Sequence, residues 1–219
     1  MRRLSLIAGI GILAVIWLGP LLAAWRDSFA AGMAAHMGVI ALASPMIAIG
    51  LPEQWRPGHS MPAILPILAS IFELAVVWGW HAPSMREFAE TSMAGTVAEQ
   101  ATFLAAGLLL WTTSFCAPQQ RMHAAVGAAA LLLTSIHMTL LGALLALSPR
   151  PLYGSGQVTC FGLVLTAGQD QQLGGVMMLI VGAVVYLTGG IVLIGQLLAP
   201  DAQTASQAPS NRDQSLHPR

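Results

Sequence analysis

Six long apolar stretches fill most of this 219-residue chain. Each is close to the roughly 20 mostly apolar residues that a helix needs to cross a bilayer. Only 8% of the residues are charged, whereas soluble domains carry roughly 25%. A chain this apolar cannot cover itself with polar surface, which excludes a soluble enzyme. The sequence therefore predicts an all-α, polytopic transmembrane helical bundle. The six predicted spans are Leu4–Trp25, Ala31–Gly50, Met61–Trp80, Glu99–Cys116, Ala124–Leu147 and Leu173–Leu198.

The spans form one domain, residues 1–199, followed by a tail, residues 200–219. The tail is rich in Gln, Ser, Pro and Asp and lacks apolar residues to bury, so we expect it to be disordered. Val158–Leu165 is apolar but too short to span, which predicts a half-buried or re-entrant seventh segment. The longer connections are expected at His81–Ala98 and Ser148–Gln172.

The distribution of arginine predicts the orientation, because cytoplasmic loops carry an excess of positive charge. Six arginines fall on the side of the N-terminus and three on the other, so both termini are predicted to be cytoplasmic. An apolar run after two arginines is also typical of a signal peptide. Its length of about 20 residues exceeds the usual 7–15, which favours a retained helix. The first group is Arg2, Arg3, Arg56, Arg121, Arg212 and Arg219, and the second is Arg26, Arg86 and Arg150.

Charge and cysteine content exclude several partners and chemistries. The net charge is zero, and no basic patch exists that would hold nucleic acid. Cys116 and Cys160 form neither a C-x-x-C motif nor a zinc pattern. They are expected near opposite membrane faces, so we predict that they do not pair. The chain shows no hydrolytic triad, P-loop or hydride-cofactor motif, which predicts no enzymatic activity.

Ionisable side chains inside the predicted spans need an explanation, because burying them in a bilayer costs free energy. Glu73 lies in the third span, and His81 follows that span directly before Ala82-Pro83. His137 lies in the middle of the fifth span, where a histidine rarely faces lipid. Each residue also has a purely structural interpretation. Glu73 would be neutral and bonded to a neighbouring helix, His81 would be solvated at the span end, and His137 would be a core histidine with a satisfied partner.

Histidine and methionine occur together on the second span. Met33, His36 and Met37 occupy positions i, i+3 and i+4, so their side chains can converge. Thioether sulfur favours Cu(I), and this set is a sensible environment for that ion. A core methionine stripe with one satisfied histidine explains the same pattern.

A polar segment opens the sixth predicted span. Asp170, Gln171 and Gln172 precede Gly174-Gly175, and Met177 and Met178 follow within the first turns. An acid near a helix N-terminus is favoured by the helix dipole. A helix cap with small-residue packing also accounts for the segment.

On the predicted topology these residues gather in the outer half of the membrane. We therefore expect them to meet around one hollow that opens outward, a candidate site on the periplasmic face. The residues in that half are His36, Glu73, His81, Glu99, Asp170, Met177 and Met178, with His137 near the midplane.

Four sequence pieces, in order across roughly residues 29–198, resemble the polytopic CtaG-type assembly factors associated with caa3 cytochrome c oxidases. The W-x-W-H-x-P and D-Q-Q-L-G-G pieces are the most specific. The pieces are His36-Met37 with Ser44-Pro45 and Gly50-Leu51-Pro52; Glu73 with Trp78-Gly79-Trp80-His81-Ala82-Pro83; Ser148-Pro149-Arg150-Pro151-Leu152-Tyr153; and Asp170-Gln171-Gln172-Leu173-Gly174-Gly175 with Met177-Met178.

The resemblance implies a multi-span protein of the bacterial plasma (inner) membrane that helps mature a haem–copper oxidase in the respiratory chain. Many members carry additional histidines where this chain has Gly32, Thr96 and Gln100, while Glu99 is retained. Fewer imidazoles imply weaker metal binding, binding through methionine, or a site used only for protein contact.

The leading hypothesis is a chaperone that holds or passes copper on the periplasmic side. Its metal ligands would be His36, His81, His137 and Met177 or Met178. Glu73 and Asp170 would orient histidine N–H groups, with Glu99, Gln171 and Gln172 as further polar support. The alternatives are a metal-free scaffold that binds an oxidase subunit within the bilayer, and a small transporter or haem-handling protein in which His36 and His137 are axial ligands.

Overall fold

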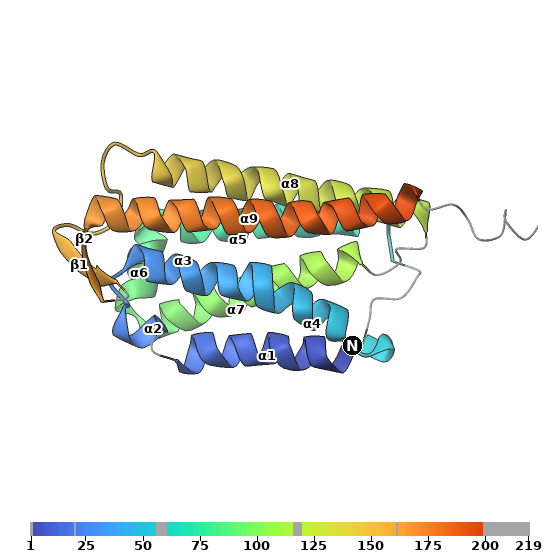
Figure 1. The fold of residues 1–219 in the computed structure, drawn as a ribbon, viewed down its shortest axis with the longest axis horizontal. Helices are drawn as coiled ribbons and strands as arrows, with labels where there is room; N and C mark the ends of the chain where they lie inside the picture. The colour runs from blue at the N-terminus through green and yellow to red at the C-terminus, as the bar shows by residue number, and fades with distance from the viewer. Residues whose placement is uncertain (1, 20, 56–60, 116–119, 161, 199–219) are drawn as a thin grey trace, which may run out of the picture.

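The computed structural model describes residues 2–19, 21–55, 61–115, 120–160 and 162–198. Within these ranges the chain is a bundle of long helices with a short hairpin at one end (Figure 1). The predicted tail from Pro200 and the predicted position of Cys116 lie outside the described residues. The helices are α1 (Arg2–Leu18), α2 (Leu21–Ala24), α3 (Phe29–Met37), a π-helical segment (Gly38–Ala43), α4 (Ser44–Gly50), a 3-10 turn (Glu53–Trp55), α5 (Leu65–Trp80), α6 (Pro83–Thr91), α7 (Met93–Ser114), α8 (Arg121–Ala146) and α9 (Ala167–Leu198), and the strands are β1 (Gln157–Cys160) and β2 (Leu163–Thr166).

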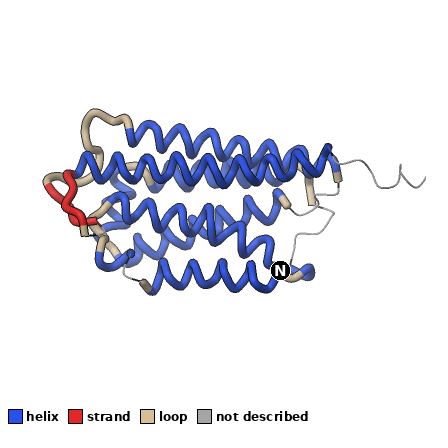
Figure 2. Tube along the Cα trace, viewed as in Figure 1, coloured by secondary structure: helices blue, strands red, loops and turns tan. Residues whose placement is uncertain are grey.

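The helices confirm the predicted polytopic bundle. Among the described residues, five stretches are long and apolar enough to cross a membrane, and α5 with α6 makes a sixth if this bent pair is counted as one span. The helices run side by side along the bundle (Figure 2). The five stretches are Arg2–Ala24, Phe29–Gly50, Met93–Ser114, Arg121–Ala146 and Ala167–Leu198.

The predicted connection His81–Ala98 is wrong, because most of it is helical. Helix α6 follows α5 after a bend of 73°, and α7 begins at Met93 rather than at Glu99. Pro83 is in the first turn of α6, after Ala82 in an extended conformation, as the restricted backbone before a proline requires. Helix α6 is short and charged on one face, so a criterion based on long apolar runs does not detect it.

The short apolar segment Val158–Leu165 is not re-entrant but forms an antiparallel hairpin. Gln157 pairs with Thr166 and Cys160 with Leu163. Gly162 lies at the turn with a φ of 81°, a conformation that glycine adopts without steric cost. The two strands satisfy one another's backbone groups. Cys160 is buried as a free thiol.

The last helix starts earlier than predicted, at Ala167 instead of Leu173. Thr166 and Gln169 form a reciprocal cap: the Thr166 amide donates to Gln169 Oε1 over 3.0 Å, and the Gln169 amide donates to Thr166 Oγ1 over 3.3 Å. The polar residues before Leu173 therefore occupy the first two turns of the helix. Hydropathy marks the apolar part of such a helix but not its capped polar start.

Small residues allow the helices to pack closely. A Cβ atom on Gly175 would lie 2.6 Å from the backbone nitrogen of Ala146, so α8 and α9 touch backbone to backbone. A Cβ on Gly50 would lie 2.5 Å from the Leu6 nitrogen, which brings α1 equally close to α4. This close approach is typical of membrane helix pairs. In the second span a π-helical segment precedes Pro45, and Ser44 Oγ donates to the Val39 carbonyl over 2.8 Å.

Candidate functional site

Two imidazoles and one thioether meet inside the bundle, toward the end that carries the hairpin. Met33 and His36 lie on α3, and His81 caps the C-terminus of α5. His81 Nε2 lies 3.2 Å from Met33 Sδ, and the His36 and His81 ring centroids are 5.6 Å apart. All three side chains are buried. We call this set the Met33–His36–His81 cluster.

The backbone orients His81 toward the cluster. Its Nδ1 is 2.7 Å from the carbonyl of Val77. A carbonyl only accepts, so Nδ1 carries the proton, and in the neutral ring Nε2 is left with a free lone pair facing Met33. The His81 carbonyl accepts from the Tyr153 hydroxyl over 2.7 Å. Burial raises the pKa of Tyr153 to about 12, so this hydroxyl stays a donor at neutral pH.

His36 and His137 are buried without hydrogen bonds to the described residues. Neither ring nitrogen of either residue has a partner. The His36 ring instead packs against Phe103, with centroids 4.1 Å apart. His137, on α8, lies close enough to His36 for the two rings to interact electrostatically. Buried polar atoms usually have a partner, so these four nitrogens are candidate ligand atoms.

Glu73 belongs to a different set of contacts. It accepts from the Tyr186 hydroxyl over 2.7 Å and from Thr134 Oγ1 over 3.1 Å. Thr134 in turn lies 2.8 Å from the Ser70 hydroxyl. This network joins α5, α8 and α9. The expectation that Glu73 orients a histidine N–H group is therefore wrong, and the plain alternative of a Glu bonded to neighbouring helices describes it.

Asp170 is also used elsewhere, as a cap for α3. Its carboxylate accepts from Ser28 Oγ over 2.7 Å and from the Phe29 amide over 2.6 Å. An acid at a helix N-terminus satisfies free amides and complements the dipole. The expectation that Asp170 orients a histidine is wrong for the same reason as for Glu73, since its oxygens are taken by backbone and serine.

The remaining polar residues of the last helix also have structural contacts. Gln171 accepts from the Leu152 amide over 2.6 Å and donates to the Leu145 carbonyl over 3.0 Å, which fixes the loop that carries Tyr153. Gln172 is exposed. The Asp-Gln-Gln piece of the resemblance thus holds together the end of the bundle that contains the Met33–His36–His81 cluster.

The methionines at the start of α9 occupy two environments. Met178 is fully buried in the main core. Met177 packs against Ala30, Ala31 and Cys160. The sulfur that contacts an imidazole belongs to Met33, on α3. Sequence spacing placed Met33 near His36 but could not reveal its contact with His81 on another helix.

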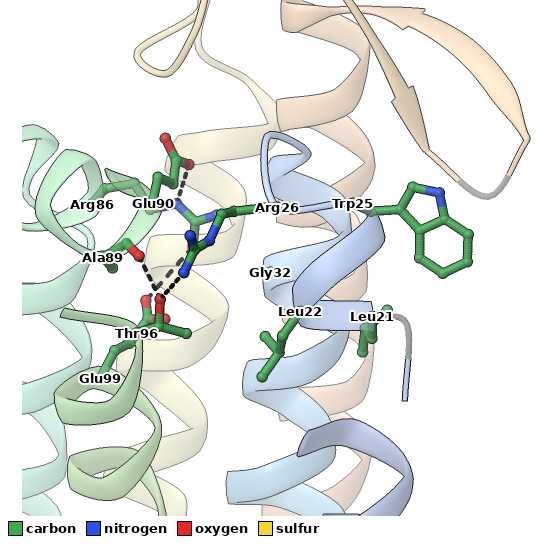
Figure 3. Close-up of a pocket in the computed structure, with 10 residues that line it drawn as sticks. All are labelled: Leu21, Leu22, Trp25, Arg26, Gly32, Arg86, Ala89, Glu90, Thr96 and Glu99. Atoms are coloured by element: carbon green, nitrogen blue, oxygen red, sulfur yellow. Dashed lines mark hydrogen bonds and ion pairs between the residues drawn. The ribbon is translucent and has the colours of Figure 1, made fainter. Parts of the chain in front are cut away.

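A buried arginine lies beside the cluster and was not among the candidate site residues identified from the sequence. Arg86, 5% exposed, lies 2.6 Å from Glu90 and 3.6 Å from Glu99. Its guanidinium is 5.5 Å from the Phe29 ring centroid. The spacing of Arg86 and Glu90, i and i+4 on a helix, was the one available signal, but it required α6 to be recognised first. Figure 3 shows Arg86 and Arg26 reaching into the same small pocket.

Arg86 occupies the space above Gly32. A Cβ on Gly32 would lie 2.6 Å and 2.7 Å from its two terminal nitrogens. Thr96 accepts from Arg26 Nη2 over 2.8 Å, and Gln100 accepts from Trp17 Nε1 over 3.2 Å. These are the three positions at which the resemblance leads one to expect histidine. In this chain Arg86 lies against Gly32, Arg26 donates to Thr96, and Trp17 donates to Gln100.

The predicted convergence of the polar residues is therefore only partly present. His36 and His81 converge and His137 lies nearby, but Glu73 and Asp170 belong to separate networks. Among the described residues, no group of three or more His, Cys, Asp or Glu side chains could hold a metal ion. Any metal in this region would need the sulfur of Met33 beside the imidazoles.

Comparison with curated proteins and with solved structures finds no match. The model of one protein family, described as the cytochrome c oxidase caa3 assembly factor, matches residues 1–199. That range includes every helix and strand described above. The chain therefore belongs to the family of cytochrome c oxidase caa3 assembly factors.

Proposed function

We propose that this assembly factor holds Cu(I) at the Met33–His36–His81 cluster on its way to the oxidase. The observation that carries the proposal is the pairing of His81 Nε2 with Met33 Sδ over 3.2 Å, beside a fully buried His36 whose ring nitrogens have no hydrogen-bond partner among the described residues. Copper is the cargo here. His137 is a further buried imidazole with an electrostatic effect on His36.

The donor set favours Cu(I) over other ions. A neutral imidazole nitrogen and a thioether sulfur are soft ligands, whereas Zn²⁺ and Cu²⁺ sites usually include thiolates, carboxylates or several imidazoles.

A site with few ligands suits transfer. A cluster of one thioether and two or three imidazoles gives copper few protein ligands, so a partner that supplies more ligands can remove the ion. We propose the periplasmic face of the inner membrane as the place of transfer and a membrane subunit of the oxidase as the recipient. The role is that of a chaperone, without catalysis.

Titration with Cu(I) tests this proposal. The protein is purified anaerobically in detergent and titrated in competition with a colorimetric Cu(I) chelator. Met33→Leu removes the sulfur and keeps the volume, so affinity should fall at least about tenfold, which corresponds to roughly 1.4 kcal/mol. Met46→Leu, on an exposed position of α4, is the matched control and should bind as the wild type does.

Equal affinity in the wild type and in the His36→Ala/His81→Ala/His137→Ala triple variant would reject the copper site. The second candidate function, a metal-free scaffold, is favoured by one observation: Asp170, Gln171 and Tyr153 all make internal contacts that stabilise one end of the bundle. Excess copper in the medium separates the two functions. It should restore oxidase activity in a strain carrying Met33→Leu only if copper delivery is the role.

A further inference from the structure

A groove on the outside of the bundle carries a second, independent inference. It lies between the α1–α2 segment and the first turns of α7, with a volume of about 580 Å³. Its walls are mostly apolar, and its polar side chains include Arg26, Thr96 and Gln100. The residues that matter below are Trp17, Leu22, Arg26, Met93, Val97 and Gln100.

Arg26 is the charged group of this groove. It is half-buried in the connection between α2 and α3, and its Nη2 donates to the neutral hydroxyl of Thr96 over 2.8 Å. None of the carboxylates in the described ranges lies within ion-pair distance of Arg26, whereas Arg86 nearby has both Glu90 and Glu99. A guanidinium presents five donors in a planar fork that fits phosphate oxygens. Arg26 therefore gives the groove a cation with no ion-paired carboxylate of its own among the described residues, while Glu90 and Glu99 nearby are paired with Arg86.

The rest of the groove suits a hydrocarbon chain. Val97 is 59% exposed and Met93 70%, and both lie on the face of α7 that lines the groove. Trp17 closes the floor by donating from Nε1 to Gln100 Oε1 over 3.2 Å. Tryptophan beside arginine at the end of a span is typical of the level at which lipid headgroups lie. The cation of the groove thus matches a lipid headgroup, and its apolar lining matches an acyl chain.

The groove has a volume of about 580 Å³, within the range of pockets for small molecules, roughly 300–1,000 Å³, and its single cation beside an apolar wall matches the chemistry of a phosphate joined to a hydrocarbon chain. We propose that this groove binds an anionic phospholipid, with the headgroup phosphate on Arg26 and an acyl chain along Trp17 and Val97.

Native mass spectrometry of the full chain in detergent tests the proposal. Phosphatidylglycerol and phosphatidylcholine with identical acyl chains are titrated separately, and apparent affinities are taken from the lipid-bound peaks. The wild type should prefer phosphatidylglycerol about fivefold, the effect of one cation beside an anionic headgroup. Arg26→Gln should abolish this preference, while Arg150→Gln, an exposed loop arginine, should retain it.

A second pair of variants tests the acyl part of the groove. Val97→Trp fills it and should weaken both lipids, whereas Ile191→Trp, at an equally exposed position of α9 (64%), should weaken neither. Millimolar inorganic phosphate should not displace phosphatidylglycerol, because a free phosphate lacks the chain. The proposal fails if Arg26→Gln keeps the headgroup preference, if Val97→Trp binds lipid as Ile191→Trp does, or if phosphate alone competes fully. These readouts are independent of copper.

Discussion

At the scale of single residues, the polar groups in this bundle divide into those with internal partners and those without. Glu73, Asp170 and Gln171 are bonded on several sides. His36 and His137 are not bonded to any described residue. Since all of them are nearly inaccessible, burial alone does not mark function in this protein. Leaving a buried polar atom unpaired costs about 1–3 kcal/mol, and this cost is the physical reason for proposing His36 and His137 as ligand residues.

The Glu73 network should be measurable as stability. Tyr186→Phe removes the hydroxyl that donates to Glu73 over 2.7 Å and leaves a buried carboxyl oxygen without its donor. We expect the free energy of unfolding to fall by about 1–3 kcal/mol, measured by denaturant titration in detergent. Thr188→Val removes a hydroxyl that is bonded only within its own helix and should change stability little. If Tyr186→Phe lost no more stability than Thr188→Val, the proposed contribution of the Tyr186–Glu73 hydrogen bond would be contradicted.

Gly32 should tolerate no side chain while Arg86 is present. Gly32→Ala places a Cβ within 2.7 Å of both terminal nitrogens of Arg86, so the guanidinium must move away from Glu99. We expect a loss of about 1–3 kcal/mol in the free energy of unfolding. In an Arg86→Met background the same change should cost much less. A double-mutant cycle checks this, and equal costs in both backgrounds would show that the two residues do not interfere.

At the scale of helices and strands, the ends of the elements depend on side chains far away in sequence. Helix α3 begins where it does because Asp170, on α9, accepts from the first amides of α3. Asp170→Ala should therefore loosen that end of α3. We expect faster hydrogen exchange at the amides of Phe29 and Ala30 and a stability loss of about 1–2 kcal/mol. Asp27→Asn, at an exposed acid nearby, should leave both unchanged, and protection that persists in Asp170→Ala would refute the cap.

Sequence alone predicted the long helices because membrane thickness sets their length and hydropathy. It missed α6, whose residues are charged on one face and too few to span, and it misread the hairpin Gln157–Thr166 as a single apolar segment. It named His36, His81 and His137 as candidates, since a histidine inside a span stands out. It could not place Met33 against His81 or Arg86 against Gly32, because contacts between helices have no signature in one sequence.

At the scale of the whole molecule, α6 and the hairpin lie at one end of the bundle, while α1 begins and α9 ends at the opposite end (Figure 1). The arginine distribution predicts that the hairpin end faces the periplasm. In a chain with Cys116 and Cys160 replaced by Ala, Leu163→Cys on the hairpin should react with a membrane-impermeant maleimide in spheroplasts. Met122→Cys, equally exposed at 66% against 63%, should react only after permeabilisation. The reverse pattern would invert the predicted orientation.

The position of Arg86 over Gly32 also constrains how members of this family can diverge. A histidine at position 32 and the guanidinium of Arg86 would need the same volume, so one chain cannot hold both as they stand here. An imidazole at position 32 would require the guanidinium of Arg86 to move or the arginine to be replaced. Among relatives, these two positions should therefore vary together, with histidine at one excluding arginine at the other.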